Sequence, residues 1–144
     1  MKRVHNIRIR TIERDRALAK ETIDALMSLA GIERKDVQIT ITDDEGLAVA
    51  EAWMEKQTPI RKLLALLNDK LPVEQKNKIA ENPTRYLDMA THCFLRLDKD
   101  AFYNDKLSLK DAGECIHIRL NIAAFPATKE NATAILASLF SQAQ

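Results

Sequence analysis

The sequence lacks most of the signals that identify the common functional classes. None of its apolar stretches approaches the roughly 18 residues of a membrane-spanning helix, and no apolar secretory segment follows the basic N-terminus. A glycine-rich phosphate loop, a nucleophile elbow and a His-Glu helix motif are all missing. We therefore expect neither a membrane protein nor an enzyme, and no cofactor. Two cysteines without a secretory signal favour a reducing, cytoplasmic location.

Glycine and proline are also scarce. The three glycines and four prolines all fall at the boundaries of predicted elements, and no linker rich in glycine, serine or proline separates two parts of the chain. The 144 residues are therefore predicted to form one domain. Because the net charge is only +1, an anion-binding surface would have to come from local clustering of basic residues.

The hydrophobic pattern predicts alternating strands and helices. Strands are expected at residues 4–11, 37–42, 47–54, 91–97 and 115–124, with a further short one at 107–109. Helices are expected at residues 15–30, from 58 to the proline at 72, at 73–80, and from 128 onward. Strands that follow strands imply an antiparallel or mixed sheet. The predicted fold class is α+β, a two-layer sandwich with helices packed on one face of the sheet.

Individual residues predict where some of these helices and strands begin or end. Gly31 is expected to end the first helix, and Thr58 to cap the second with Pro59 as its first helical residue. The segment at 47–54 is rich in alanine, which also suits a helix, but the turn at 43–46 favours a hairpin. Polar residues dominate 68–82, so residues 68–90 are expected to form a mobile helical excursion outside the core.

Three segments alternate in the same way, at residues 6–10, 94–97 and 116–121. Successive side chains of a strand point to opposite faces, so each segment has one apolar side and one side of hydrogen-bond donors and positive charge. If the apolar sides share a core, the other sides form one basic sheet surface. The residues predicted to contact RNA there are Arg8, Arg10, Phe94, Arg96, His117, Arg119 and Asn121.

The chemistry of these side chains suits RNA. Arginine presents a planar fork of donors to phosphate and can stack on bases. Phe94 can stack an unpaired base, while His117 and Asn121 can hydrogen-bond base edges or the 2′-hydroxyl. The competing interpretation is that a solvent-facing strand surface has to be polar in any case, and that Phe94 packs under a loop.

A metal site is the weaker interpretation of the histidines and cysteines. His92 and Cys93 are adjacent on a strand and point to opposite faces, so with Cys115 they do not converge as zinc ligands must. The same alternation makes a disulfide between the two cysteines improbable and places His5 with the packed side chains of the first strand. The acidic groups at 43–45 and 98–100 can bind magnesium, but acidic turns are common in any protein.

Several of these segments also resemble a known archaeal family of RNA-binding proteins that are predicted exosome subunits. The resemblance is carried by residues 4–7, 94–99, 113–120 and 123–126, and covers the first strand and about residues 91–139. Family members often have a basic residue where this chain has Asn121. The resemblance implies a fold like that of the large-subunit ribosomal protein L-five, and RNA with exosome or ribosomal components as partners. The alternative is an interaction module that docks on an RNA-processing assembly without touching RNA.

Overall fold

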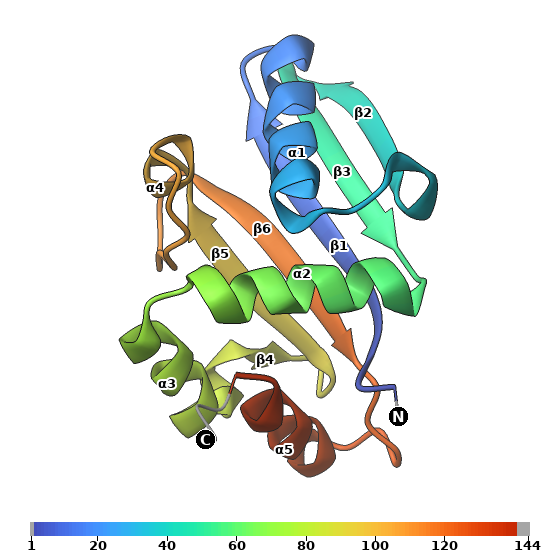
Figure 1. Cartoon of the computed structure of the whole chain (residues 1–144), viewed down its shortest axis with the longest axis vertical. Helices are drawn as coiled ribbons and strands as arrows, with labels where there is room; N and C mark the ends of the chain where they lie inside the picture. Colours follow the sequence, from blue (N-terminus) through green and yellow to red (C-terminus); the bar gives the residue numbers. More distant parts are fainter. Residues whose placement is uncertain (1, 141–144) are drawn as a thin grey trace.

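The computed structural model describes residues 2–140, which form a six-stranded antiparallel sheet and the helices that pack on it (Figure 1). The strands are β1 (Val4–Glu13), β2 (Gln38–Asp44), β3 (Leu47–Met54), β4 (Leu87–Asp88), β5 (His92–Asp98) and β6 (Cys115–Ile122). The helices are α1 (Arg16–Ala30), α2 (Gln57–Lys70), α3 (Val73–Glu81), α4 (Lys99–Tyr103) and α5 (Lys129–Phe140). Short 3-10 helices cover Arg34–Asp36 and Pro83–Tyr86. The predicted α+β sandwich is confirmed.

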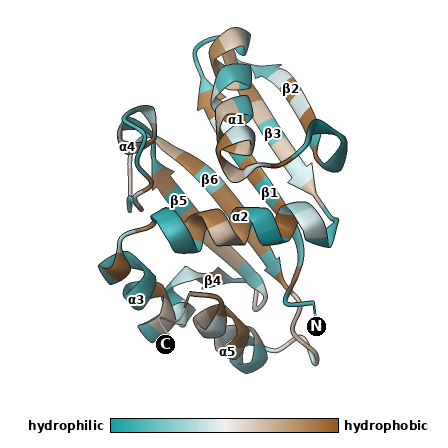
Figure 2. Cartoon of the chain, in the orientation of Figure 1, coloured by the Kyte–Doolittle hydropathy of each residue, from teal (hydrophilic) through white to brown (hydrophobic). Residues whose placement is uncertain are grey.

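The sheet has the strand order β2-β3-β1-β6-β5-β4, and every neighbouring pair is antiparallel. Helices α1 and α2 lie across one face of it, whereas α3 and α5 pack together at the end near β4 (Figure 1). Figure 2 shows hydrophobic and hydrophilic segments alternating along β1 and β5, as expected of strands with one buried side. None of the helices in residues 2–140 has the length and apolar character needed to cross a membrane.

The core lies between the sheet and the helices. The covered sides of β1, β6 and β5 supply fully buried aliphatic side chains, among them Ile7, Ile118 and Leu95. Strand β3 contributes the small residues Ala50 and Ala52, against which α1 packs. Small side chains let a helix approach the sheet closely. Helix α1 packs over the half of the sheet that contains β3 and β1.

Several predicted boundaries are confirmed by their capping geometry. The Asp15 carboxylate accepts a hydrogen bond from the Leu18 amide at 2.8 Å and caps α1, and Gly31 ends the helix in the left-handed region with φ 71°. The hairpin between β2 and β3 turns through Glu45 and Gly46, both at positive φ. Two positive φ values match the twist of the strands that such a turn connects.

The start of α2 was predicted two residues late. The helix starts at Gln57, so Thr58 and Pro59 both lie in its first turn. The first amides of a helix have no partner within it, so proline is tolerated anywhere in this turn. The Gln57 side chain donates to the carbonyl oxygen of Val4 at 3.0 Å, which ties the start of α2 to β1.

The expectation that the polar stretch after α2 lies outside the core is wrong. Leu71, Ile79 and Leu87 are buried, and α3 packs against α5. Even Lys76 is buried and donates to the Asn68 carbonyl oxygen. The polar composition concealed this, because one apolar residue per helical turn is enough to anchor a short helix.

Two further expectations need correction. The predicted short strand at 107–109 is an isolated bridge between Leu109 and Leu97. His5 is exposed rather than packed, because a β-bulge between Val4 and Asn6 interrupts the alternation of β1.

Candidate nucleic-acid interface

The three alternating segments become neighbours in the sheet. Strand β1 pairs with β6, and β6 pairs with β5. Their aliphatic residues face the helices and are buried, whereas the residues between them are half-buried or exposed on the opposite side. The positive side chains of all three strands therefore share the face of the sheet that turns away from the helices.

Rows of side chains cross this face perpendicular to the strands. The first row, in strand order β3-β1-β6-β5, consists of Trp53, Arg8, Arg119 and Phe94. The second row consists of Glu51, Arg10, His117 and Arg96. A third row consists of Asn6, Asn121 and His92. We call these three rows the open face, and it contains every residue that the sequence predicted to contact RNA.

Most arginines of the open face have no acidic partner in the part of the chain that the structure describes. Arg10 Nε lies 3.4 Å from Glu51 Oε1. Within residues 2–140, neither Arg8, Arg96 nor Arg119 forms an ion pair with a carboxylate. Like charges held side by side without counter-charge favour the binding of an anion.

Arg8 and Arg119 are direct register partners on neighbouring strands. Burial, followed by the charge of Arg8, lowers the pKa of the Arg119 guanidinium, which remains protonated at neutral pH. The Nε atom of Arg119 is buried and has no hydrogen-bond partner among residues 2–140. A hollow of about 180 Å³ lies here, lined by Arg8, Arg10, Arg119 and His117 together with Phe94. It contains donors and no carboxylate, which suits a phosphate group.

The histidines of the open face stay neutral near pH 7. Burial lowers the pKa of His117, and the charges of Arg96 and Arg10 lower it further. Burial, followed by the charge of Arg119, has the same effect on the pKa of His92. Neutral imidazole both donates and accepts a hydrogen bond, so these rings can read polar groups of a base or sugar.

Aromatic rings stand at both ends of the first row. Phe94 is 38% exposed, and the half-buried Trp53 donates from its indole nitrogen to Glu55 at 2.7 Å. The sequence interpretation did not include Trp53 in the site. The sequence pattern does assign Trp53 to the face opposite Ala52 and Met54, which are buried. Alternation along one strand, however, does not reveal that β3 lies beside β1.

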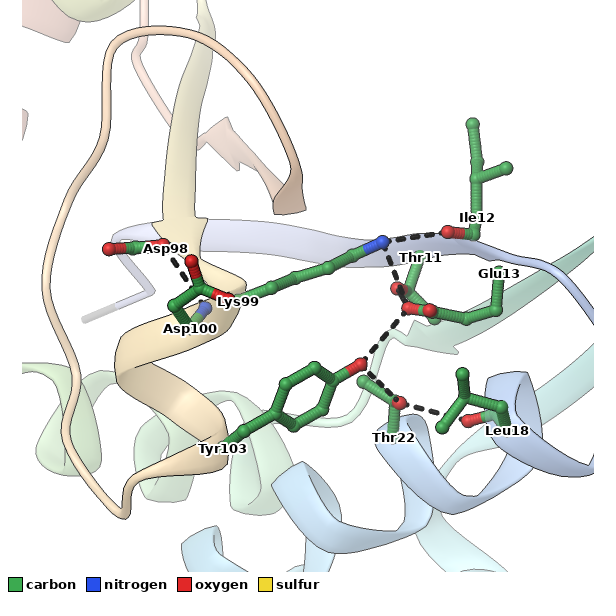
Figure 3. A network of polar contacts seen from close by, with 9 residues as sticks. All are labelled: Thr11, Ile12, Glu13, Leu18, Thr22, Asp98, Lys99, Asp100 and Tyr103. Atoms are coloured by element: carbon green, nitrogen blue, oxygen red, sulfur yellow. Dashed lines mark hydrogen bonds and ion pairs between the residues drawn. The ribbon is translucent and has the colours of Figure 1, made fainter.

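A second polar group lies on the covered side and was also missed. Lys99 of α4 lies 2.9 Å from the Glu13 carboxylate of β1 and donates to the Ile12 carbonyl oxygen at 2.7 Å. Figure 3 shows Thr11 and Tyr103 converging on the same carboxylate. Both charged side chains are buried and satisfied by each other, so this group ties α4 to β1.

The remaining polar candidates stay dispersed. Cys93 and Cys115 are buried free thiols, and burial raises the pKa of Cys93 to about 12. No cluster of three or more histidine, cysteine or acidic side chains suited to a metal occurs within residues 2–140. Asp43 pairs with Arg16, and Asp98 caps α4 by accepting from the Asp100 amide. These carboxylates therefore have structural roles.

Two comparisons with known proteins concern RNA binding. A family model described as RNA binding matches residues 6–122 of the chain. RNA-binding protein PAB1135 of Pyrococcus abyssi is 29% identical over 133 residues, which cover 88% of this chain and 86% of that protein.

Solved structures show the same fold. Protein AF2318 of Archaeoglobus fulgidus is similar with a TM-score of 0.78 at 18% identity, and the match covers 97% of this chain and 100% of that one. Mth689, a DUF54 protein of Methanothermobacter thermautotrophicus, gives a TM-score of 0.69 at 16% identity with the same coverage. At this low sequence identity, the solved structures support the fold alone. Membership of the family is shown by the family model, which matches most of the chain. This protein therefore belongs to the family of RNA-binding proteins that the model describes.

Proposed function

We propose that the open face is the RNA-binding surface of this protein and that it binds without catalysis. The observation that carries the proposal is the first row, in which two adjacent arginines lie between two aromatic rings and have no acidic partner in the described part of the chain. Neighbouring strands lie about 4.8 Å apart, so Trp53 and Phe94 are separated by about 14 Å across the sheet. Phosphates bind the arginines between them, and bases stack on the rings.

The second and third rows extend this surface. Arg96 and Arg10 contribute further phosphate contacts, while His117 and Asn121 donate and accept hydrogen bonds at base edges and 2′-hydroxyl groups. The helices lie on the other side of the sheet, so RNA reaches the open face without displacing any of them.

The biological role that we propose is that of an accessory protein in RNA processing, RNA degradation or ribosome assembly. The resemblance to the archaeal family of predicted exosome subunits, with a fold like ribosomal protein L-five, supports this role. Under this proposal the protein carries RNA on its sheet, and its helical layer stays available to exosome or ribosomal components.

The proposal is tested by fluorescence anisotropy with short labelled RNAs at two salt concentrations. The triple variant Arg8→Ala, Arg96→Ala and Arg119→Ala should lose RNA binding and remain folded. Each phosphate contact that is lost lowers the salt slope of the binding constant by about 0.7 for single strands. Binding by the wild type should also change the fluorescence of Trp53, which is the only tryptophan of the chain.

A matched control removes the same charge from the helical side. Arg16, Arg34 and Arg61 are exposed and lie outside the sheet. Replacing these three by alanine should leave RNA affinity nearly unchanged. If both triple variants bind like the wild type, the open face is not the RNA site. If the wild type binds no RNA, the alternative of a docking module for an acidic protein partner is favoured.

A further inference from the structure

A second, larger hollow lies at the outer edge of β5. Strand β4 pairs with this edge at His92 and Cys93. Further along, the Asp98 amide donates to the Ser108 carbonyl at 2.8 Å, and the Lys110 amide donates to the Arg96 carbonyl at 2.9 Å. Between these two covered stretches the structure has a cleft of about 570 Å³, lined on opposite sides by residues 85–88 and 109–111. This volume lies within the range of roughly 300–1,000 Å³ that is typical of small-molecule sites.

The walls of this cleft differ from the hollow between Arg8 and Arg119. Two aromatic side chains, Tyr86 and Phe94, line it together with the apolar Leu87 and Leu109. Flat rings and aliphatic groups are the usual surroundings of a bound nucleobase.

The charges of the cleft are largely paired or acidic. Arg85 lies 3.3 Å from Asp111, so this exposed ion pair joins the two sides of the cleft, and Lys110 lies 3.6 Å from Asp98. Asp88 also lines the cleft. Carboxylates repel phosphate but accept hydrogen bonds from the amino and imino groups of bases. The cleft is therefore suited to a base, and the hollow between the arginines to a phosphate.

Phe94 lines both the cleft and the hollow. A nucleotide whose base occupies the cleft therefore has its neighbouring phosphate group close to Arg119 and Arg8. Arg96, which forms no ion pair within residues 2–140, also lines the cleft and stands one row away. The cleft and the hollow therefore adjoin at Phe94, on the same face of the sheet.

We propose that the cleft between Tyr86 and Phe94 binds one unpaired nucleobase, so that the protein selects single-stranded or looped RNA over duplex. The inference rests on the proposed RNA-binding function of the open face and identifies the class of RNA. A base within a duplex is stacked on both faces and paired along its Watson–Crick edge, so it cannot enter a cleft of this kind.

The experiment compares a short single-stranded RNA with a blunt duplex of the same sequence, using wild type and Tyr86→Leu. Leucine retains an apolar side chain and removes the ring. The wild type should bind the single strand at least about tenfold more tightly, and Tyr86→Leu should lose roughly fivefold or more of that affinity, as stacking predicts. The salt slope should stay unchanged, because no phosphate contact is removed.

Phe125→Leu is the matched control, because Phe125 is 97% exposed and does not line the cleft. A second readout does not depend on any variant. A single strand that carries 2-aminopurine should lose base fluorescence on binding to the wild type, because the probe stacks on an aromatic ring of the cleft.

The outcomes separate the two proposals. If single strand and duplex bind equally and Tyr86→Leu has no effect, the cleft proposal is overturned while the open face still stands. A lack of 2-aminopurine quenching on binding also overturns it. If the wild type binds neither RNA, the proposed function fails and the cleft proposal fails with it.

Discussion

The two faces of the sheet differ in whether their charged side chains have partners of opposite charge. On the covered face, Lys99 and Glu13 are buried, and each is satisfied by the other and by neighbouring polar groups. On the open face, Arg8 and Arg119 lie next to each other with no carboxylate partner in the described part of the chain. A buried charge without a partner would destabilise the fold, whereas a solvated one costs little. The comparison indicates that the covered charges maintain the fold and that the open ones are available to a ligand.

The largest expected effect comes from breaking the buried pair. Lys99→Met leaves the Glu13 carboxylate buried without its counter-charge, so the free energy of unfolding should fall by about 3–5 kcal/mol. Urea denaturation measures this change.

The control for this prediction is the double variant Glu13→Gln and Lys99→Met, which removes both charges and should recover much of the stability. A loss of less than about 1 kcal/mol for Lys99→Met would show that water solvates Glu13 and that the pair does not hold α4 against β1.

The second prediction compares paired and unpaired arginines on the open face. Arg119→Gln should weaken RNA binding about tenfold or more, because it removes a charged hydrogen-bond donor that has no acidic partner within residues 2–140. Arg10→Gln should have a smaller effect, since Glu51 already offsets the charge of Arg10. Anisotropy titrations at one salt concentration measure both. Equal losses of RNA affinity in the two variants would mean that the ion pair with Glu51 does not weaken the contribution of Arg10 to RNA binding.

Much of the open face was predictable from local chemistry. Ile7 and Ile9 alternate with Arg8 and Arg10, and the period of two in a strand assigns them to opposite faces whatever packs above. The alternation could not give the strand order, because hydrogen-bonded neighbours are chosen by the whole fold. It is the order β1-β6-β5 that converts three separate stripes into one surface.

The missed features depend on contacts between residues far apart in the sequence. Lys99 follows a strand in a polar segment, which suggests a solvated side chain, yet its partner Glu13 lies far away in the sequence, at the end of β1. The bulge at His5 shifts the alternation of β1 by one residue, and no glycine or proline marks it. The cleft beside Tyr86 exists only because two remote segments cover different parts of one strand edge.

Glu51→Gln is expected to have a smaller effect than Arg119→Gln, and to raise RNA affinity rather than lower it. This change removes the only carboxylate that pairs with an arginine of the open face within residues 2–140 and leaves the side-chain volume unchanged. RNA affinity should rise several-fold. An exposed ion pair is worth about 0.2–1 kcal/mol, and in the variant, RNA binds Arg10 without first losing this interaction. The gain should shrink at high salt, and Asp24→Asn on α1 is a control that should leave affinity unchanged.

The smallest expected effect is a pH dependence from His117. Burial and the charges of Arg96 and Arg10 lower its pKa in the folded protein. As the pH falls below about 6.5, the unfolded chain binds a proton at this position before the folded protein does, so stability declines. Bound phosphates offset the arginine charges and raise the pKa again, so RNA binding should tighten in the same pH range. Urea denaturation and anisotropy between about pH 5 and pH 8 should show both trends weakened in His117→Gln. A pH dependence of binding that persists unchanged in this variant would show that His117 is not the titrating group and would direct the test to His92, the other histidine of the open face.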